Sequence, residues 1–170
     1  FNTIFSKKFS PIHLPKLEFK DGIPDEFKTF VVIPTLLTDE KRVEELAEQL
    51  EIHYLSNGEK NMYFGLIGDF KDGQSEEEKE DEKIIQKGLQ AIEELNNKYS
   101  KDEKIFYYFH RDRVYSDGEE KWMGWERKRG ALVEFNELIL GNEDTTYSVI
   151  SSDISSLKNK IKYIITLDAD

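Results

Sequence analysis

The sequence predicts an α/β fold in which helices cover both faces of a mostly parallel sheet. Short apolar or aromatic runs, typical of buried strands, alternate with longer segments whose apolar residues recur at helical spacing. The predicted order is strand, helix, strand, helix, strand, helix, strand. A chain of 170 residues is long enough for one ordinary domain with a substantial core.

The first predicted strand and helix follow a proline-rich start. Residues 1–29 hold three of the four prolines and show no sustained periodicity, which indicates an extended arm. Residues 30–35 (FVVIPT) form a β-branched run that Pro34 is expected to stop. Thr38 or Asp39 then caps a helix. The apolar residues of this helix follow helical spacing: Val43, Leu46, Ala47, Leu50 and Tyr54.

The second strand and helix surround an acidic block. Residues 62–70 (MYFGLIGDF) read as a strand that ends beside Asp69. The block 75–83 (SEEEKEDEK) is expected to open a helix as a solvated first turn, because acidic groups complement the positive N-terminus of a helix. The helix carries an apolar set: Ile84, Ile85, Leu89, Ile92 and Leu95.

The remaining elements complete the alternation. Residues 104–110 (KIFYYFH) form an aromatic strand that leads into Arg111. A helix is expected from about residue 124 to residue 140, and Gly141 is its expected C′ residue. One face of that helix carries Trp125, Leu132, Phe135 and Ile139. A polar loop over 142–160 precedes a final strand, read as buried, that starts at 163 and ends in Asp168-Ala169-Asp170.

Composition excludes several classes of function. A formal charge of -11 argues against a general nucleic-acid binder, because Lys and Arg supply affinity for phosphate backbones. The absence of cysteine excludes disulfides and thiolate metal sites, and the three histidines have no zinc-type spacing. No apolar run approaches the roughly 18 to 20 residues that span a bilayer. Any metal must therefore bind oxygen ligands.

The candidate site lies at the carboxyl edge of the sheet. Parallel strands end together at this edge, where open α/β sheets bind ligands, so Thr35, Asp69, Arg111 and the Asp168/Asp170 pair are expected to converge. Two neighbouring carboxylates repel each other and lose solvation, so a divalent cation is their natural partner. The alternative is a strand that simply runs into an Asx turn.

The block 122–130 (WMGWERKRG) is the second candidate feature. Three consecutive basic residues near a helix start oppose the dipole preference. One explanation is a diphosphate, neutralised by helix-start N–H groups together with Lys and Arg. The alternative is a basic surface patch balanced by Glu126, Glu134 and Glu137, with Trp122 and Trp125 as packing residues. Neither a dinucleotide fingerprint nor a P-loop occurs.

Four segments resemble the glycosyltransferase domain of cyclic β-1,2-glucan synthases, a family 84-like glycosyltransferase. They are 31–37 (VVIPTLL), 51–57 (EIHYLSN), 110–136, which contains WMGWERKRG, and 163–170 (YIITLDAD). The resemblance implies the front half of a Rossmann-like, GT-A type fold over residues 30–170, truncated at the Asp-x-Asp motif. It also implies an inverting, metal-dependent glucosyltransferase that uses UDP-glucose to make cyclic β-1,2-glucan. The fragment alone is expected to be inactive.

The resemblance assigns roles to residues that bind the donor. Pro34 and Thr35 would line the uridine pocket, and Asp69 would contact uracil. Lys128 and Gly130 would adjoin the diphosphate.

The resemblance also places the metal and the parts beyond this chain. Asp168 and Asp170 would hold Mg²⁺ or Mn²⁺ bridging the diphosphate oxygens. The catalytic base is expected beyond Asp170, together with the site for a β-1,2-glucan acceptor. The fragment is expected to be soluble, whereas its parent would be embedded in the inner membrane with this part at the cytoplasmic face.

Two further interpretations compete with the transferase. A phosphatase of the haloacid dehalogenase type also ends an apolar strand in Asp-x-Asp, binds Mg²⁺ and uses the first Asp as nucleophile. That class begins its domain with the motif, whereas here a long segment precedes it. The non-enzyme alternative is a Rossmann-like interaction module whose acidic face binds partners.

Overall fold

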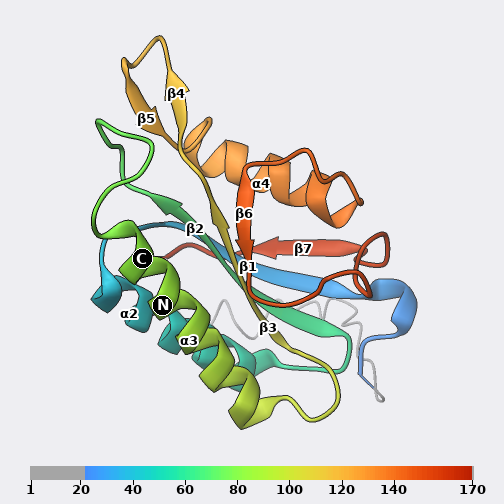
Figure 1. Ribbon diagram of the computed structural model, residues 1–170. Helices are drawn as coiled ribbons and strands as arrows, with labels where there is room; N and C mark the ends of the chain where they lie inside the picture. The colour runs from blue at the N-terminus through green and yellow to red at the C-terminus, as the bar shows by residue number, and fades with distance from the viewer. Residues whose placement is uncertain (1–21, 170) are drawn as a thin grey trace, which may run out of the picture.

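Five strands form the central sheet: β1 (Thr29–Leu37), β2 (Met62–Phe70), β3 (Phe106–Arg111), β6 (Tyr147–Ile150) and β7 (Tyr163–Thr166). Their order is β6-β3-β2-β1-β7, as Figure 1 shows. Neighbours among β3, β2, β1 and β7 run parallel, and β6 pairs antiparallel with β3. The computed structural model describes residues 22–169; most of the predicted arm and Asp170 lie outside this part.

Helices cover both faces of the sheet, which confirms the predicted three-layer α/β arrangement (Figure 1). One face of the sheet packs against α2 (Glu40–Asn57) and α3 (Asp81–Tyr99), and the other packs against α4 (Arg127–Ile139). Alternation along β1 supplies both cores, because Val31 and Ile33 join the first while Phe30 and Val32 join the second. The sheet is therefore apolar on both sides, as expected for parallel strands.

Pro34 does not stop the first strand, so that prediction is wrong: β1 continues to Leu37. The carbonyl of Val32 accepts the N–H of Leu167 at 2.9 Å, so Val32 faces the β7 side. Pro34 faces the same side two residues later, beyond Thr166, where β7 has ended. The missing N–H of the proline therefore costs no ladder bond, while pairing with β2 continues on the other side.

The helix boundaries are partly as predicted. Asp39 caps α2, and its carboxylate accepts the N–H of Arg42 at 2.9 Å. The acidic block mostly precedes α3, which begins only at Asp81. Asp81 is not solvated as expected, because it is buried and Arg113 donates to both of its oxygens. Gly141 has a φ of +92° after α4, which confirms it as the C′ residue.

Three short strands were not predicted. Strands β4 (Val114–Ser116) and β5 (Lys121–Met123) form a hairpin that projects beyond the sheet near the start of α4 (Figure 1). Strand β6 lies within the predicted polar loop. Strands of three or four residues carry too little alternation for a periodicity signal, and β6 buries only Tyr147.

Strand β7 is not buried as predicted. It pairs with β1 at the end of the sheet, and the side chains of Tyr163 and Ile165 are 51% and 44% exposed. Its apolar composition suggested a central strand, but the described residues cover neither face of it fully. Within residues 22–169, no helix is long and apolar enough to cross a membrane.

Candidate functional site

Two ion pairs mark the carboxyl edge of the parallel strands. At the ends of β2 and β3, Arg111 donates from Nε to Asp69 Oδ1 at 2.7 Å and from Nη2 to Asp69 Oδ2 at 2.6 Å. At the start of α4, Lys128 Nζ donates to Asp168 Oδ1 at 2.5 Å, just after β7. The structure thus joins Asp69 to Arg111 and Lys128 to Asp168, two pairings that the sequence did not predict.

The pair at β2 and β3 is buried and fully bonded. The side chain of Arg111 has no exposed surface. Its Nη1 donates to the carbonyl of Trp125 at 3.1 Å and to Glu134 at 3.2 Å, and its Nη2 also donates to the carbonyl of Arg127 at 3.1 Å. Burial raises the pKa of the Asp69 carboxyl above its ordinary value, and the Arg111 guanidinium opposes that shift. The bidentate geometry is that of a charged pair.

The carbonyls that Arg111 binds belong to residues 124–130, which we call the 124–130 turn. Glu126 and Arg127 have φ values of +46° and +50°, in the left-handed region that non-glycine residues rarely adopt. A Cβ on Gly124 would lie 2.8 Å from Asp69 Oδ2, and one on Gly130 would lie 1.9 Å from the carbonyl oxygen of Trp125. Both glycines of the WMGWERKRG block are therefore required by close approach.

The three basic residues of the block have different partners. Arg127 binds both oxygens of Asp72 at 3.0 Å, and Arg129 forms an ion pair with Glu126. The balanced-patch interpretation therefore holds for Arg129. Lys128 alone crosses to the segment after β7. Trp125 does not extend the apolar face of α4 as predicted, because it precedes the helix and is 42% exposed.

Other predicted donor-site residues lie on β1 and α4. Pro34 is buried within β1, and Thr35 beside it is partly exposed. Gly130 is buried in the first turn of α4, where its N–H already donates to the carbonyl of Glu126 at 3.1 Å.

Asp168 is the described half of the predicted cation site. Its side chain is 82% exposed, and the hydrogen bond from Lys128 holds the pKa of its carboxyl below the ordinary value. It is therefore an ionised, accessible carboxylate, and Mg²⁺ and Mn²⁺ bind groups of this type. Asp170 lies outside the described residues. Within 22–169 no three acidic or histidine side chains are grouped to hold a metal, so a cation here needs further ligands.

Arg42 is a residue of this edge that the sequence reasoning missed. Its Nη2 donates to the carbonyl of Ala169 at 2.6 Å, while Leu167 donates to β1. Arg42 lies in the first turn of the helix that follows β1, where a basic residue opposes the dipole. A basic residue in the first turn of a helix is therefore the sequence signal that could have pointed to Arg42, as it did for Lys128.

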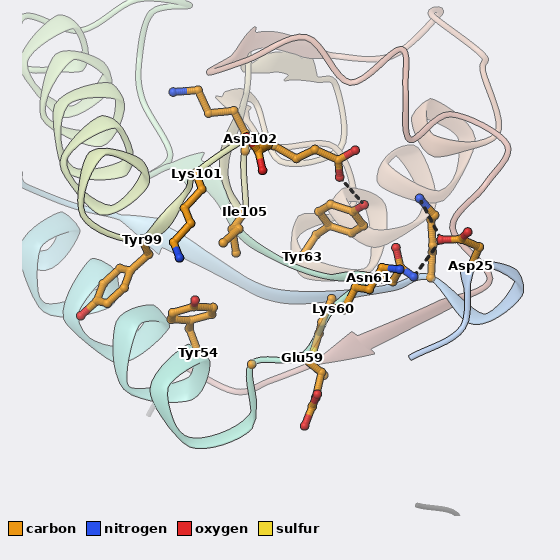
Figure 2. Close-up of a pocket in the computed structure, with 15 residues that line it drawn as sticks. Asp25, Tyr54, Glu59, Lys60, Asn61, Tyr63, Tyr99, Lys101, Asp102 and Ile105 are labelled. Atoms are coloured by element: carbon orange, nitrogen blue, oxygen red, sulfur yellow. Dashed lines mark hydrogen bonds and ion pairs between the residues drawn. The ribbon is translucent and has the colours of Figure 1, made fainter. Parts of the chain in front are cut away.

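A hollow of about 680 Å³ opens at the opposite end of the sheet, where β2 and β3 begin (Figure 2). Figure 2 shows Asn61 bonded to Asp25 along its wall, and the Tyr63 hydroxyl donates to Glu103 at 3.4 Å. Its charged lining residues are balanced: Asp25, Glu59, Asp102 and Glu103 against Lys28, Lys60, Lys101 and Lys104. This balance does not favour a highly charged anion such as a diphosphate.

His110 is packed in the interior of the protein. It is fully buried, lies 3.9 Å from Phe70 between ring centroids, and its Nδ1 is 3.0 Å from the carbonyl oxygen of Arg111. Burial lowers the pKa of the imidazole from 6.5 to about 4. The carbonyl accepts, so Nδ1 carries the proton in the neutral ring.

His110 should make folding sensitive to mild acid. The unfolded chain takes up a proton near pH 6.5 and the folded chain near pH 4, so stability falls as pH falls through that window. Between pH 7 and pH 4.5, the free energy of unfolding measured with urea should fall by about 2–3 kcal/mol more in the unsubstituted protein than in His110→Phe. The variant is the control because it keeps the contributions of the carboxylates to the pH dependence. Equal losses in both proteins would contradict the burial of a neutral imidazole.

Comparisons with known proteins found one relative of the whole chain. No family model matches the chain. Over 171 aligned residues it is 39% identical to cyclic beta-(1,2)-glucan synthase NdvB from Rhizobium meliloti (strain 1021). The alignment covers 100% of this chain but only 6% of that protein. The similarity therefore extends over both ion pairs and the 124–130 turn.

Proposed function

We propose that this chain, which is related along its whole length to a segment of a cyclic β-(1,2)-glucan synthase, is the donor-binding part of a UDP-glucose-dependent glucosyltransferase. The observation that carries the proposal is the contact between Lys128 and Asp168. This contact brings the WMGWERKRG block, which carries the resemblance to glucan synthases, to the Asp-x-Asp motif at the sheet edge where α/β folds bind ligands.

The two residues suit the two charges of a metal–diphosphate ligand. Asp168, with Asp170, would hold Mg²⁺ or Mn²⁺, which when bound stabilises negative charge on the departing UDP. Lys128 supplies a cation at the start of α4, and in the nucleotide-bound state it donates to a diphosphate oxygen instead of Asp168. Both groups are exposed, so they can exchange partners without opening the core.

The uridine would lie beside the end of β1. Thr35 is partly exposed there, and among the described residues its hydroxyl makes only a long 3.4 Å contact with the neighbouring carbonyl of Leu36, which leaves it available to a ligand. Asp69 was expected to contact uracil, but it is 4% exposed and both its oxygens accept from Arg111. These contacts favour a supporting role for Asp69.

The rest of the reaction belongs to other parts of a longer synthase. This chain spans 6% of its relative's length, and we propose that the catalytic base, the glucan acceptor site and the membrane-embedded parts lie elsewhere in such a protein. The isolated chain would then bind UDP without transferring glucose.

Calorimetric titration with UDP tests the proposal. Binding should tighten at least about tenfold when Mn²⁺ is added, and Lys128→Ala should weaken it by about tenfold, because a charge-assisted hydrogen bond to phosphate is lost. Lys104→Ala, in the hollow at the opposite end of the sheet, is the matched control and should leave the affinity for UDP unchanged.

The same titration is repeated on a segment of a longer synthase that extends past Asp170, so that both carboxylates are followed by chain. Absence of binding there, or binding that ignores both Mn²⁺ and Lys128→Ala, would overturn the transferase proposal. That outcome would leave the interaction module as the better description.

A further inference from the structure

We propose that Arg111 is a positioning residue: it holds the 124–130 turn so that Lys128 faces Asp168. The inference rests on the proposed function for the role of Lys128. It assigns the Asp69–Arg111 pair a task other than contact with the nucleotide, namely support of the loop that carries the diphosphate-binding lysine.

The bonding of Arg111 leaves nothing for a ligand. A guanidinium has five N–H donors. One Nε donor and one Nη2 donor bind Asp69, the second Nη2 donor binds the carbonyl of Arg127, and the two Nη1 donors bind Glu134 and the carbonyl of Trp125. Because every donor is used and the side chain has no exposed surface, a ligand could bind Arg111 only by breaking these contacts.

The contacts of Arg111 fall on the part of the turn that needs support. The carbonyls it binds flank Glu126, and both Glu126 and Arg127 have positive φ values. Non-glycine residues stay in that region only when the surrounding structure holds them there. Gly124 lets the turn lie directly on the Asp69–Arg111 pair, since a Cβ there would be 2.9 Å from Arg111 Nη2.

The conformation of the 124–130 turn determines where Lys128 points. Lys128 directly follows the Arg127 carbonyl that Arg111 binds, and it occupies the first turn of α4. The N–H of Arg127 donates to the carbonyl of Gly124 at 3.0 Å, which closes a turn at the start of α4. Relaxing the left-handed φ values of Glu126 and Arg127 would therefore rotate the start of the helix. The contact between Lys128 and Asp168 would be lost although both side chains were intact.

The experiment has one readout without ligand and one with UDP. Arg111→Lys keeps the charge but cannot reproduce the planar five-donor geometry. Hydrogen exchange of residues 126–130 should become at least about tenfold faster, while exchange in β1 and β2 changes little. Arg113→Lys is the matched control, because Arg113 is also buried and bidentate to an aspartate but contacts Asp81 and not the turn.

A double-mutant cycle separates positioning from direct contact. Arg111→Lys should weaken Mn²⁺–UDP binding about as much as Lys128→Ala, and the double variant should be no weaker than Lys128→Ala alone. An undiminished effect of Arg111→Lys in the Lys128→Ala background, or unchanged exchange in the turn, would overturn the proposal.

The proposal stays testable if Arg111→Lys does not fold or if the protein does not bind UDP. If Arg111→Lys does not fold, Gly124→Ala takes its place, since it displaces the turn without removing a charge and should give the same exchange and binding results. If the wild-type chain does not bind UDP in the longer segment, the proposed function fails. The exchange experiment then still decides whether Arg111 holds the turn.

Discussion

Replacing Arg111 with alanine should lower the free energy of unfolding by about 3–5 kcal/mol, the usual cost of removing one partner from a buried ion pair. The substitution would leave the carboxylates of Asp69 and Glu134 without their cation and would release the carbonyls of Trp125 and Arg127. Urea unfolding followed by far-UV circular dichroism measures the change through the transition midpoint.

Arg127→Ala is the matched control for stability. Arg127 also binds an aspartate with two nitrogens, but its side chain is 46% exposed. Pairs in that position contribute about 0–1 kcal/mol because water screens them. Similar losses of unfolding free energy for Arg111→Ala and Arg127→Ala would show that burial does not distinguish the two ion pairs. That result would contradict a strong stabilising role for Arg111.

The proposed function predicts that Asp168→Ala, made in a longer synthase that contains this chain, reduces glucan formation from UDP-glucose at least about a hundredfold, because the proposed metal ion at the diphosphate would stabilise the transition state by several kcal/mol. The loss should appear mainly in kcat/KM, measured by incorporation of labelled glucose. The fold should be unaffected, because Asp168 is exposed and contacts only Lys128 among the hydrogen bonds and ion pairs of the described residues.

Asp153→Ala controls for the loss of a negative charge. Asp153 is exposed as well, and within residues 22–169 its carboxylate accepts hydrogen bonds only from Ser155, two residues away. Its removal should leave glucan formation within about twofold of the unsubstituted enzyme, as expected of a surface position away from the site. Full activity in Asp168→Ala would contradict the proposed metal role of the Asp-x-Asp motif.

The sheet and its helices could be predicted because their signals are local and redundant. Strand β2 was predicted at its observed bounds, since MYFGLIGDF is an apolar run between turn-forming segments. The cap at Asp39 and the C′ residue Gly141 follow from chemistry within a few residues. Strand β6 and the β4–β5 hairpin could not be found in this way, because they are too short to show alternation and are defined by pairing.

The sequence by itself determined the α/β class, the order of the main elements and the edge at which Thr35, Asp69 and Asp168 would lie. The spacing of apolar residues and the order of the elements can be read along the chain without knowing which side chains meet in the folded protein. Only the tertiary structure decided the partners: Asp69 with Arg111, Lys128 with Asp168, and both glycines of WMGWERKRG against the Asp69–Arg111 pair and Trp125. The two ion pairs join residues that are 40 or more positions apart in the sequence. Such pairings depend on packing in three dimensions and not on local pattern.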